Sequence, residues 1–297
     1  MFKLVLIDGN AILHRAYHAL PPLTTKRGEP INAVYGFISM LLRIIQDLKP
    51  SHIAVAFDRK EPTFRHKEFA AYQAQRPEMD RELSSQFDKA RDVITSFGIP
   101  IYDKAGYEAD DVIGTIANKV KDDVVIVTGD RDILQLVDSR VKIYMPVAGM
   151  SQGKIMGTDE VIEKMGVPPE QIADYKALVG DPSDNYPGVS GIGPKTATKL
   201  LSKYQSLEGI YKNLDKLEAP VATKLKEGKA SAKISQKLAR IVTDVPLEFE
   251  IEKMGKWKVN SNKVLDLFSE YGFKTLTKRV KDVGDRIEKE AQMTLLE

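Results

Sequence analysis

Acidic residues recur in short groups along the chain, at spacings that can do chemistry. Nine of them stand out: Asp8, Asp58, Glu108, Asp110, Asp111, Asp130, Asp132, Asp181 and Asp184. Taken group by group, each has an ordinary explanation, because acids stabilise the first turn of a helix and Asp-Pro-Ser-Asp is common turn and N-cap chemistry. Gathered in one place, the same nine residues would form a cation site, so the question is whether the fold brings them together.

Nine carboxylates in a small volume cannot all stay ionised without cations. Oxygen ligands select hard ions such as Mg²⁺ or Mn²⁺, and this number of acids suits two ions better than one. The chain has no cysteine, which excludes thiol nucleophiles and cysteine-type zinc sites. Two ions about 4 Å apart stabilise the attacking and leaving oxygens of an in-line displacement at phosphorus. The reaction that these residues suggest is phosphodiester hydrolysis.

Short apolar runs precede three of these acids and would position them. The runs have the length and β-branched content of buried parallel strands and cover residues 2–8, 52–58 and 124–130. Helical patterns at 33–48 and 110–120 alternate with them, which predicts an α/β fold with a parallel sheet covered on both faces. The carboxyl ends of parallel strands meet at one rim, where sites form. The acids are therefore expected to share that rim.

The remaining patterns divide the chain into three parts. Residues 60–98 are long and charged for a crossover, and we expect two helices there that leave the sheet and join around Pro77. After a further strand at 141–145 the pattern is wholly helical. The expected organisation is a sheet domain over 1–155, a helical region over 156–281 and a charged tail over 282–297.

The net charge of +2 is unevenly distributed. Residues 188–240 carry eleven lysines or arginines against four acids, a net charge of +7, so the remainder of the chain carries −5. This separation favours one surface for a polyanion and another that concentrates carboxylates. A solvated, lysine-rich helical face is the alternative explanation.

Composition excludes several classes of protein. Hydrophobic residues make up 42% and charged residues 29%, which fits neither a disordered nor a fibrous chain. The N-terminal apolar run is too short for a signal peptide, and no stretch of about 18 uncharged apolar residues occurs. We expect a soluble, cytoplasmic monomer that does not enter a membrane.

Eight motifs occur in order along residues 3–280. They are Asp8-Gly9-Asn10, Ala33-Val34-Tyr35-Gly36-Phe37, Ala56-Phe57-Asp58, Phe64-Arg65-His66, Gly106-Tyr107-Glu108-Ala109-Asp110-Asp111, Gly129-Asp130-Arg131-Asp132, Gly180-Asp181-Pro182-Ser183-Asp184-Asn185 and Pro187-Gly188-Val189-Ser190-Gly191-Ile192-Gly193-Pro194-Lys195-Thr196-Ala197. Together they resemble the 5′ nuclease (flap endonuclease) family, and most closely its branch of 5′→3′ exonuclease domains found in bacterial DNA polymerase I and in free-standing relatives. Each motif alone is weak evidence, whereas eight in register are specific.

The resemblance implies a fold and a division of the acids. It implies a PIN-like α/β core, a helical arch at about 60–98 that passes single-stranded 5′ ends, and a helix–three-turn–helix module at about 180–204 that grips duplex DNA. By position, one ion would be held by Asp8, Asp58, Glu108 and Asp110. The second would be held by Asp130, Asp132 and Asp184, with Asp111 and Asp181 acting through water.

The resemblance also implies phosphate and base contacts near the arch. Arg15, Arg65 and Arg76 fall where the family places phosphate-clamping cations. Tyr72 falls where an aromatic ring can stack on a displaced base, although it can equally pack inside the arch. Gln73 stands where the family commonly carries a lysine that meets the scissile phosphate, and this departure puts the catalytic rate in question.

A glycine-rich turn precedes an expected helix at Lys195. Its backbone amides and the following side chains are expected to contact duplex phosphates through Gly188, Gly191, Gly193, Lys195, Thr196 and Lys199. In the family a monovalent cation, often K⁺, sits against the carbonyls of this turn. The turn is no P-loop, because Pro194 separates Gly193 from Lys195 and no hydrophobic strand precedes it.

The implied activity is metal-dependent cleavage of 5′ flaps or 5′ ends on duplex DNA, with an RNA primer strand as a further substrate. Two alternatives stay open. An RNase of the wider PIN superfamily would share the acidic rim but lack the arch and duplex module. A structure-specific DNA-binding subunit with weak chemistry would fit Gln73 but not the full set of acids.

The last residues contain Gln292-Met293-Thr294-Leu295-Leu296, which resembles peptides that dock on bacterial sliding clamps. A flexible strand could place these side chains in a polar subsite and an apolar groove. The alternatives are that the apolar residues cap the core or that a longer polymerase chain continues here.

Overall fold

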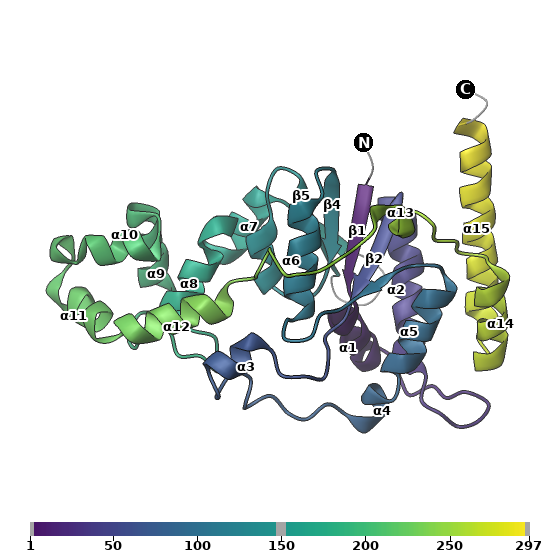
Figure 1. The fold of residues 1–297 in the computed structure, drawn as a ribbon, viewed down its shortest axis with the longest axis horizontal. Coiled ribbons are helices and arrows are strands. Elements are labelled where there is room, and N and C mark those ends of the chain that lie inside the picture. The colour runs from purple at the N-terminus through teal and green to yellow at the C-terminus, as the bar shows by residue number, and fades with distance from the viewer. Residues whose placement is uncertain (1–2, 147–152, 295–297) are drawn as a thin grey trace.

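A six-stranded sheet forms the centre of the computed structural model, which describes residues 3–146 and 153–294 (Figure 1). The strand order is β3-β2-β1-β4-β5-β6, and every neighbouring pair is parallel except the last. The strands are β1 (Lys3–Asp8), β2 (His52–Ala56), β3 (Ile101–Tyr102), β4 (Asp123–Val127), β5 (Val141–Pro146) and β6 (Gly153–Met156). The expected parallel sheet is confirmed.

Alternating side chains of the central strand enter two separate apolar layers. Leu4 and Leu6 pack in one layer, and Val5 and Ile7 pack in the other. Both sets are essentially inaccessible to solvent, as expected for a strand covered on both faces. The sheet is therefore a rigid base for whatever lies at the carboxyl ends of its strands.

Helices cover each face. The layer containing Val5 and Ile7 is completed by α1 (Gly9–Ala19), α2 (Asn32–Leu48), α5 (Phe87–Ser96), α14 (Asn262–Tyr271) and α15 (Lys274–Thr294). The opposite layer is completed chiefly by α6 (Ala109–Lys119), η1 (Asp132–Leu136), α7 (Thr158–Met165), α8 (Ile172–Val179) and α9 (Pro194–Tyr204). A short 3₁₀ turn, η2 (Pro169–Gln171), leads into α8.

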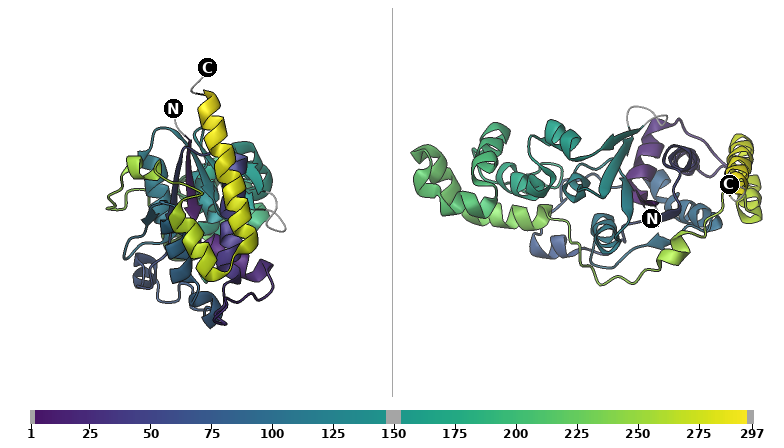
Figure 2. Two further views of the ribbon diagram at one scale, coloured as in Figure 1. Left: turned by 90° about the vertical axis from the view of Figure 1, so that its right-hand side faces the viewer. Right: turned by 90° about the horizontal axis from the view of Figure 1, so that it is seen from above.

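A helical lobe extends from one end of the sheet, and the C-terminal helix stands at the other end (Figures 1 and 2). The lobe continues from α9 through α10 (Leu207–Lys212), η3 (Leu214–Lys216), α11 (Ala219–Glu227) and α12 (Lys229–Ala239). An extended segment, residues 240–250, then returns past α6 to α13 (Ile251–Met254). No helix within the described residues is long and apolar enough to cross a membrane.

Three expectations differ from the structure. Residues 60–98 form three short helices rather than two: α3 (Phe64–Glu68), α4 (Arg81–Ser84) and α5, and α5 packs in the core instead of leaving the sheet. The antiparallel edge strand β6 was not foreseen, because its four residues carry no strong apolar pattern. The predicted tail from Asp282 instead continues α15, since Val283 reaches the core and Ile287 packs against it.

Candidate active site

The carboxyl ends of β1, β2 and β4 bring three acids to one rim, as predicted. Asp8 pairs with Ala56 across the sheet, and Ile7 pairs with Val127, so the three strands end level with one another. The following residues turn out of the sheet and place Asp8, Asp58 and Asp130 around a cavity of about 560 Å³. Seven of the nine predicted acids line this cavity: Asp8, Asp58, Glu108, Asp110, Asp130, Asp132 and Asp184.

Local hydrogen bonds fix the acids at the strand ends and at the start of α6. The Asp8 carboxylate caps α1 by accepting from the Ala11 amide at 2.9 Å, and it accepts from the Thr128 hydroxyl at 2.8 Å. The Asp58 carboxylate accepts from the Ala109 amide at 2.7 Å, which ties β2 to the first turn of α6. These hydrogen bonds position the two side chains, which both line the cavity.

Four of these acids, Asp8, Asp58, Glu108 and Asp110, form what we call the first cluster. Burial is the main cause that raises the pKa of Asp8 and that of Glu108, each to about 7. Burial, followed by the charges of Asp130 and Asp8, raises the pKa of Asp110 well above its ordinary value. The pKa of Asp58 is raised in the same direction, mainly because the surrounding protein displaces water. The first cluster therefore needs protons or cations at neutral pH.

Asp132, Asp181 and Asp184, the second cluster, lie closer together. One carboxylate oxygen from each lies within 4.8 Å of those from the other two, and no other set of three or more acidic or histidine residues meets this spacing in the part of the chain that the structure describes. Two cations neutralise them. Lys176 pairs with Asp132 and lies 2.6 Å from Asp181, and Arg76 lies 2.5 Å from Asp184.

The two clusters can accept divalent cations. The first cluster offers four carboxylate groups as oxygen donors, and cationic side chains of the protein compensate little of their negative charge. Beside the second cluster, the Tyr186 hydroxyl is buried without a hydrogen-bond partner among the described residues. Burial is the largest cause that raises the pKa of this hydroxyl, and the negative charges of the three carboxylates raise it further. A hydrated ion in the second cluster would supply that partner. Hard oxygen donors of this kind suit Mg²⁺ or Mn²⁺.

Asp111 is not placed to act as a metal ligand, even through water. Its side chain is fully buried and does not line the cavity. Its oxygens accept two hydrogen bonds from Arg65, at 2.7 and 2.8 Å, and further bonds from the amides of Glu108 and Val242. Its acceptor capacity is used within the protein.

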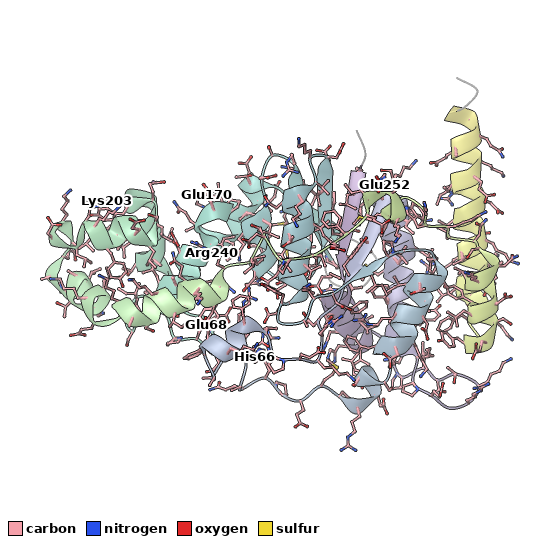
Figure 3. The ribbon with its side chains drawn as sticks, viewed as in Figure 1. His66, Glu68, Glu170, Lys203, Arg240 and Glu252 are labelled. Atoms are coloured by element: carbon pink, nitrogen blue, oxygen red, sulfur yellow. The ribbon has the colours of Figure 1, made fainter. Side chains whose placement is uncertain are left out.

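Arg65, expected to clamp a phosphate, is directed into the protein as well. Only 3% of its side chain is exposed. Besides Asp111, its guanidinium donates to the carbonyls of Leu238 and Arg240 at 2.8 and 3.0 Å. Figure 3 shows the place, where α3, carrying His66 and Glu68, lies beneath the end of α12 at Arg240. Arg65 therefore joins the arch, the start of α6 and the helical lobe.

The other arch residues reach the cavity in different ways. Arg76 lines it with 52% of its side chain exposed. The Gln73 amide donates to Asp184 at 3.3 Å, and its backbone adopts a left-handed φ of 55°. Tyr72 is 4% exposed, with its hydroxyl 3.4 Å from Glu108 and from Asp184, and its ring packs in an apolar cluster with residues of α8 and α12, so it is not open for base stacking. Arg15 lies half-buried on α1 and does not line the cavity.

The glycine-rich turn connects α8 to α9, as expected for a helix–three-turn–helix. Gly188 is an exception among the predicted contacts, because it is buried and its amide donates to the Ser235 hydroxyl at 3.2 Å. Its φ of 64° and the backbone of Gly180 leave no space for a side chain. Among the other contacts predicted for this turn, Thr196 is half-buried. The exposed ones are Gly191, Gly193, Lys195 and Lys199.

Lys176 is the site residue that the sequence patterns did not reveal. It lies on α8 within an apolar stretch, and 11% of its side chain is exposed. Burial would lower the pKa of its ammonium, but Asp132 and Asp181 outweigh that effect and raise it. A single basic residue on the buried side of a short helix that ends at an acidic turn is the signal that could have identified it.

Sequence models of two domains together match most of the chain. The 5′-3′ exonuclease N-terminal resolvase-like domain matches residues 3–166. The 5′-3′ exonuclease C-terminal SAM fold matches residues 167–262. This chain belongs to the 5′-3′ exonuclease family. The family shows that the protein is a nuclease, as the sequence predicted.

Curated relatives of this 5′-3′ exonuclease domain are much longer. DNA polymerase I of Caldicellulosiruptor bescii is 44% identical over 283 residues, which cover 94% of this chain and 33% of that protein. DNA polymerase I of Bacillus subtilis is 39% identical over 282 residues, with 94% and 32% covered. The chain thus spans about a third of the length of these relatives.

Solved structures share the fold of this exonuclease chain at low identity. The T5 D15 protein co-crystallized with metal ions has a TM-score of 0.65 at 20% identity and covers 95% of this chain and 98% of its own. A T5 D15 flap endonuclease complex with DNA and metal ions has a TM-score of 0.66 at 20% identity, with 95% and 97% covered. Human GEN1 with Holliday junction DNA has a TM-score of 0.60 at 13% identity, with 96% and 73% covered.

Proposed function

We propose that this chain is a Mg²⁺-dependent nuclease that cuts 5′ flaps or 5′ ends on duplex DNA. The products are a 5′-phosphate and a 3′-hydroxyl. The cellular roles proposed are RNA-primer removal, Okazaki-fragment maturation and excision repair. The observation that carries the proposal is the gathering of seven acids around one cavity beside an exposed arginine, Arg76.

Different residues in and around the cavity have different proposed roles. The two clusters would each hold one divalent ion, and such ions activate water and stabilise the departing oxygen in phosphodiester hydrolysis. The Arg76 guanidinium is exposed enough to leave Asp184 and bind a phosphate in a bidentate way. The Gln73 amide lies beside Asp184 and can donate a neutral hydrogen bond to the same phosphate. Arg65 and Asp111 hold the arch in place from behind.

The test is cleavage of a 5′-labelled flap duplex, with single-stranded DNA and RNA as parallel substrates, in Mg²⁺ and in EDTA. We expect cleavage near the junction in Mg²⁺ only, with the duplex-bearing substrate preferred. Preferential cleavage of single-stranded RNA would favour the PIN-type RNase. Binding of the flap without cleavage in either metal would favour the DNA-binding subunit. The helical lobe, which follows the sheet domain, argues against the first alternative.

The duplex-binding surface is proposed to lie at the start of α9. Lys195 and Lys199 are one turn apart and both exposed. Their replacement by alanine should weaken binding of flap and plain duplex alike and lower the salt slope by about one unit per lost phosphate contact. A changed sequence preference with an unchanged slope would contradict this surface.

A K⁺ ion at the glycine turn is a finer part of the proposal. Two carbonyls of the turn already accept hydrogen bonds, that of Gly191 from Lys224 at 3.1 Å and that of Gly188 from Ser231 at 2.5 Å. K⁺ would therefore compete with the Lys224 ammonium. Duplex affinity compared in KCl and LiCl, for the native chain and for Lys224→Met, measures that competition.

Clamp docking through residues 292–296 is likewise a proposal. Leu295 and Leu296 lie outside the described residues. Gln292 and Met293 are exposed at the end of α15, so a strand-like docked peptide would require this end of the helix to unwind. Titration of a peptide spanning 289–297 against a bacterial clamp tests it, with a Gln292→Ala, Leu295→Ala peptide as control.

A further inference from the structure

The ammonium of Lys176 lies between two of the three carboxylates of the second cluster. Its Nζ pairs with Asp132 and lies 2.6 Å from an oxygen of Asp181. These are two of the three carboxylates whose oxygens fall within 4.8 Å of one another. A divalent ion bound by that set would need the oxygens to which Lys176 now donates.

Lys176 is held in this place by its helix. Ile172, Ala177 and Leu178 of α8 are buried in the apolar layer beneath the sheet. Only 11% of the Lys176 side chain is exposed. The lysine cannot drift into solvent as a surface lysine can, so its charge is a fixed part of the second cluster.

Arg76, the other cation of this cluster, is different. It lies 2.5 Å from Asp184, but 52% of its side chain is exposed and it comes from the arch. It can turn away towards a phosphate without leaving a buried gap. Lys176 has no such route, and its ion pairs must be given up or rearranged within the protein.

We propose that Lys176 is a resident counter-cation that competes with the second divalent ion and thereby sets the affinity of the second cluster. This inference rests on the proposed two-ion function. Binding of the ion requires the Lys176 ammonium to withdraw from at least one of its carboxylates. Lys176 is thus a positioning residue that keeps the three acids together when no ion is bound and weakens ion binding when one arrives.

The experiment is a titration of the metal-free full chain with Mn²⁺, without DNA, followed by calorimetry and by the electron paramagnetic resonance of free Mn²⁺. Native protein is compared with Lys176→Met, which keeps the length of the side chain and removes its charge. Lys164→Met is the matched control, because Lys164 is exposed on α7 and does not line the cavity. We expect a tight and a weak class of Mn²⁺ sites in the native chain.

In Lys176→Met the weak class should tighten by about tenfold or more, because one buried charge has been removed beside it. The tight class should be unchanged, and Lys164→Met should behave as the native chain. An unchanged or weakened second class in Lys176→Met would overturn the proposal. Absence of any Mn²⁺ binding by the native chain would overturn the two-ion function instead, which separates the two failures.

Stability gives a second readout that does not depend on a binding curve. In EDTA, Lys176→Met should melt at a lower temperature than the native chain, because three close carboxylates lose their fixed cation. Saturating Mn²⁺ should raise its melting temperature by more than it raises that of the native chain. Lys176→Arg, which keeps the charge, should retain weak second-class binding if the Met variant fails to fold. An equal Mn²⁺ shift in the Met variant and the native chain, or tight second-class binding by the Arg variant, would overturn the proposal.

Discussion

The first cluster lines one cavity together with Asp132 and Asp184 of the second, but the two clusters are neutralised in different ways. The second cluster has the tighter packing of oxygens, and Lys176 and Arg76 pair with its members. Burial alone would raise the pKa of Asp181, but hydrogen bonds from Lys176 and Ser183 lower it. Asp132 differs, because burial raises its pKa to about 6 although the charge of Lys176 opposes that shift. Among the described residues, the first cluster makes one ion pair, between Glu108 and Arg65 at 3.3 Å, and Arg65 is already engaged by Asp111. Its carboxylates consequently have raised pKa values.

The difference shows that a group of acids needs positive charge nearby, but that the acids by themselves do not determine whether a side chain, a proton or a metal ion supplies it. Where the protein supplies its own cation, the metal must compete for the oxygens. Where it supplies none, protons compete instead. The four predictions below test this contrast, beginning with the largest expected effect.

Replacing Asp110 with asparagine should abolish cleavage, with a loss of at least about a thousandfold in single-turnover rate, because a cation ligand is removed. Duplex binding should persist, since the substitution relieves repulsion with Asp130 and Asp8. Asp130→Asn should behave in the same way. Undiminished cleavage by both variants in Mg²⁺ would overturn the assignment of the acids to the chemistry.

Arg65→Ala should destabilise the chain by about 3–5 kcal/mol, because it leaves the fully buried Asp111 without its cation. Arg76→Ala should cost less, about 1–2 kcal/mol, because Arg76 is 52% exposed even though its partner Asp184 is only 11% exposed. Urea unfolding of both variants measures the contrast. Equal losses of unfolding free energy would mean that the buried contacts of Arg65 stabilise the fold no more than the pair between Arg76 and Asp184 does.

The metal-free protein should lose stability as the pH rises. The folded-state pKa values of Asp8 and Glu108 are about 7, against about 4 in an unfolded chain. Between these values the native state binds more protons than the unfolded state, so raising the pH favours unfolding. With about 2 kcal/mol from each of the two groups, we expect a loss of about 4 kcal/mol from pH 5 to pH 7 in EDTA.

Mg²⁺ should flatten that pH dependence, because bound ions replace protons in the first cluster. Denaturant titrations at pH 5, 6, 7 and 8, each with Mg²⁺ and with EDTA, give the eight unfolding curves needed. A metal-free protein that grows more stable between pH 5 and pH 7 would contradict the raised pKa values.

Gln73→Lys should raise the single-turnover rate by about ten- to a hundredfold, if a cation there stabilises the charge on the phosphate. The structure adds a counter-effect, because a lysine next to Asp184 would place a third cation beside the second cluster. The Mg²⁺ concentration for half-maximal rate should therefore rise. An unchanged rate and unchanged Mg²⁺ dependence would mean that position 73 lies away from the chemistry.

Sequence alone determined the central strands of the sheet and the rim at their ends. Apolar runs ending in aspartate predicted three parallel strands, and the parallel order then required Asp8, Asp58 and Asp130 to meet. Local sequence patterns are sufficient to predict these features, because the residue pattern of a strand and the capping of a helix both depend on residues that are close together in the chain. The helical region and its glycine turn were predicted from the same kind of local signal.

Tertiary structure alone decided which charges face each other. Arg65 and Arg76 stand eleven residues apart in one motif-rich segment, yet one is buried against Asp111 and the other is exposed. The partners of Arg65 at Leu238 and Arg240 lie more than 170 residues away, and Lys176 reaches Asp132 across 44 residues. Residue type and local spacing do not encode such contacts, because the partner of a buried charge is set by the packing of distant elements around it.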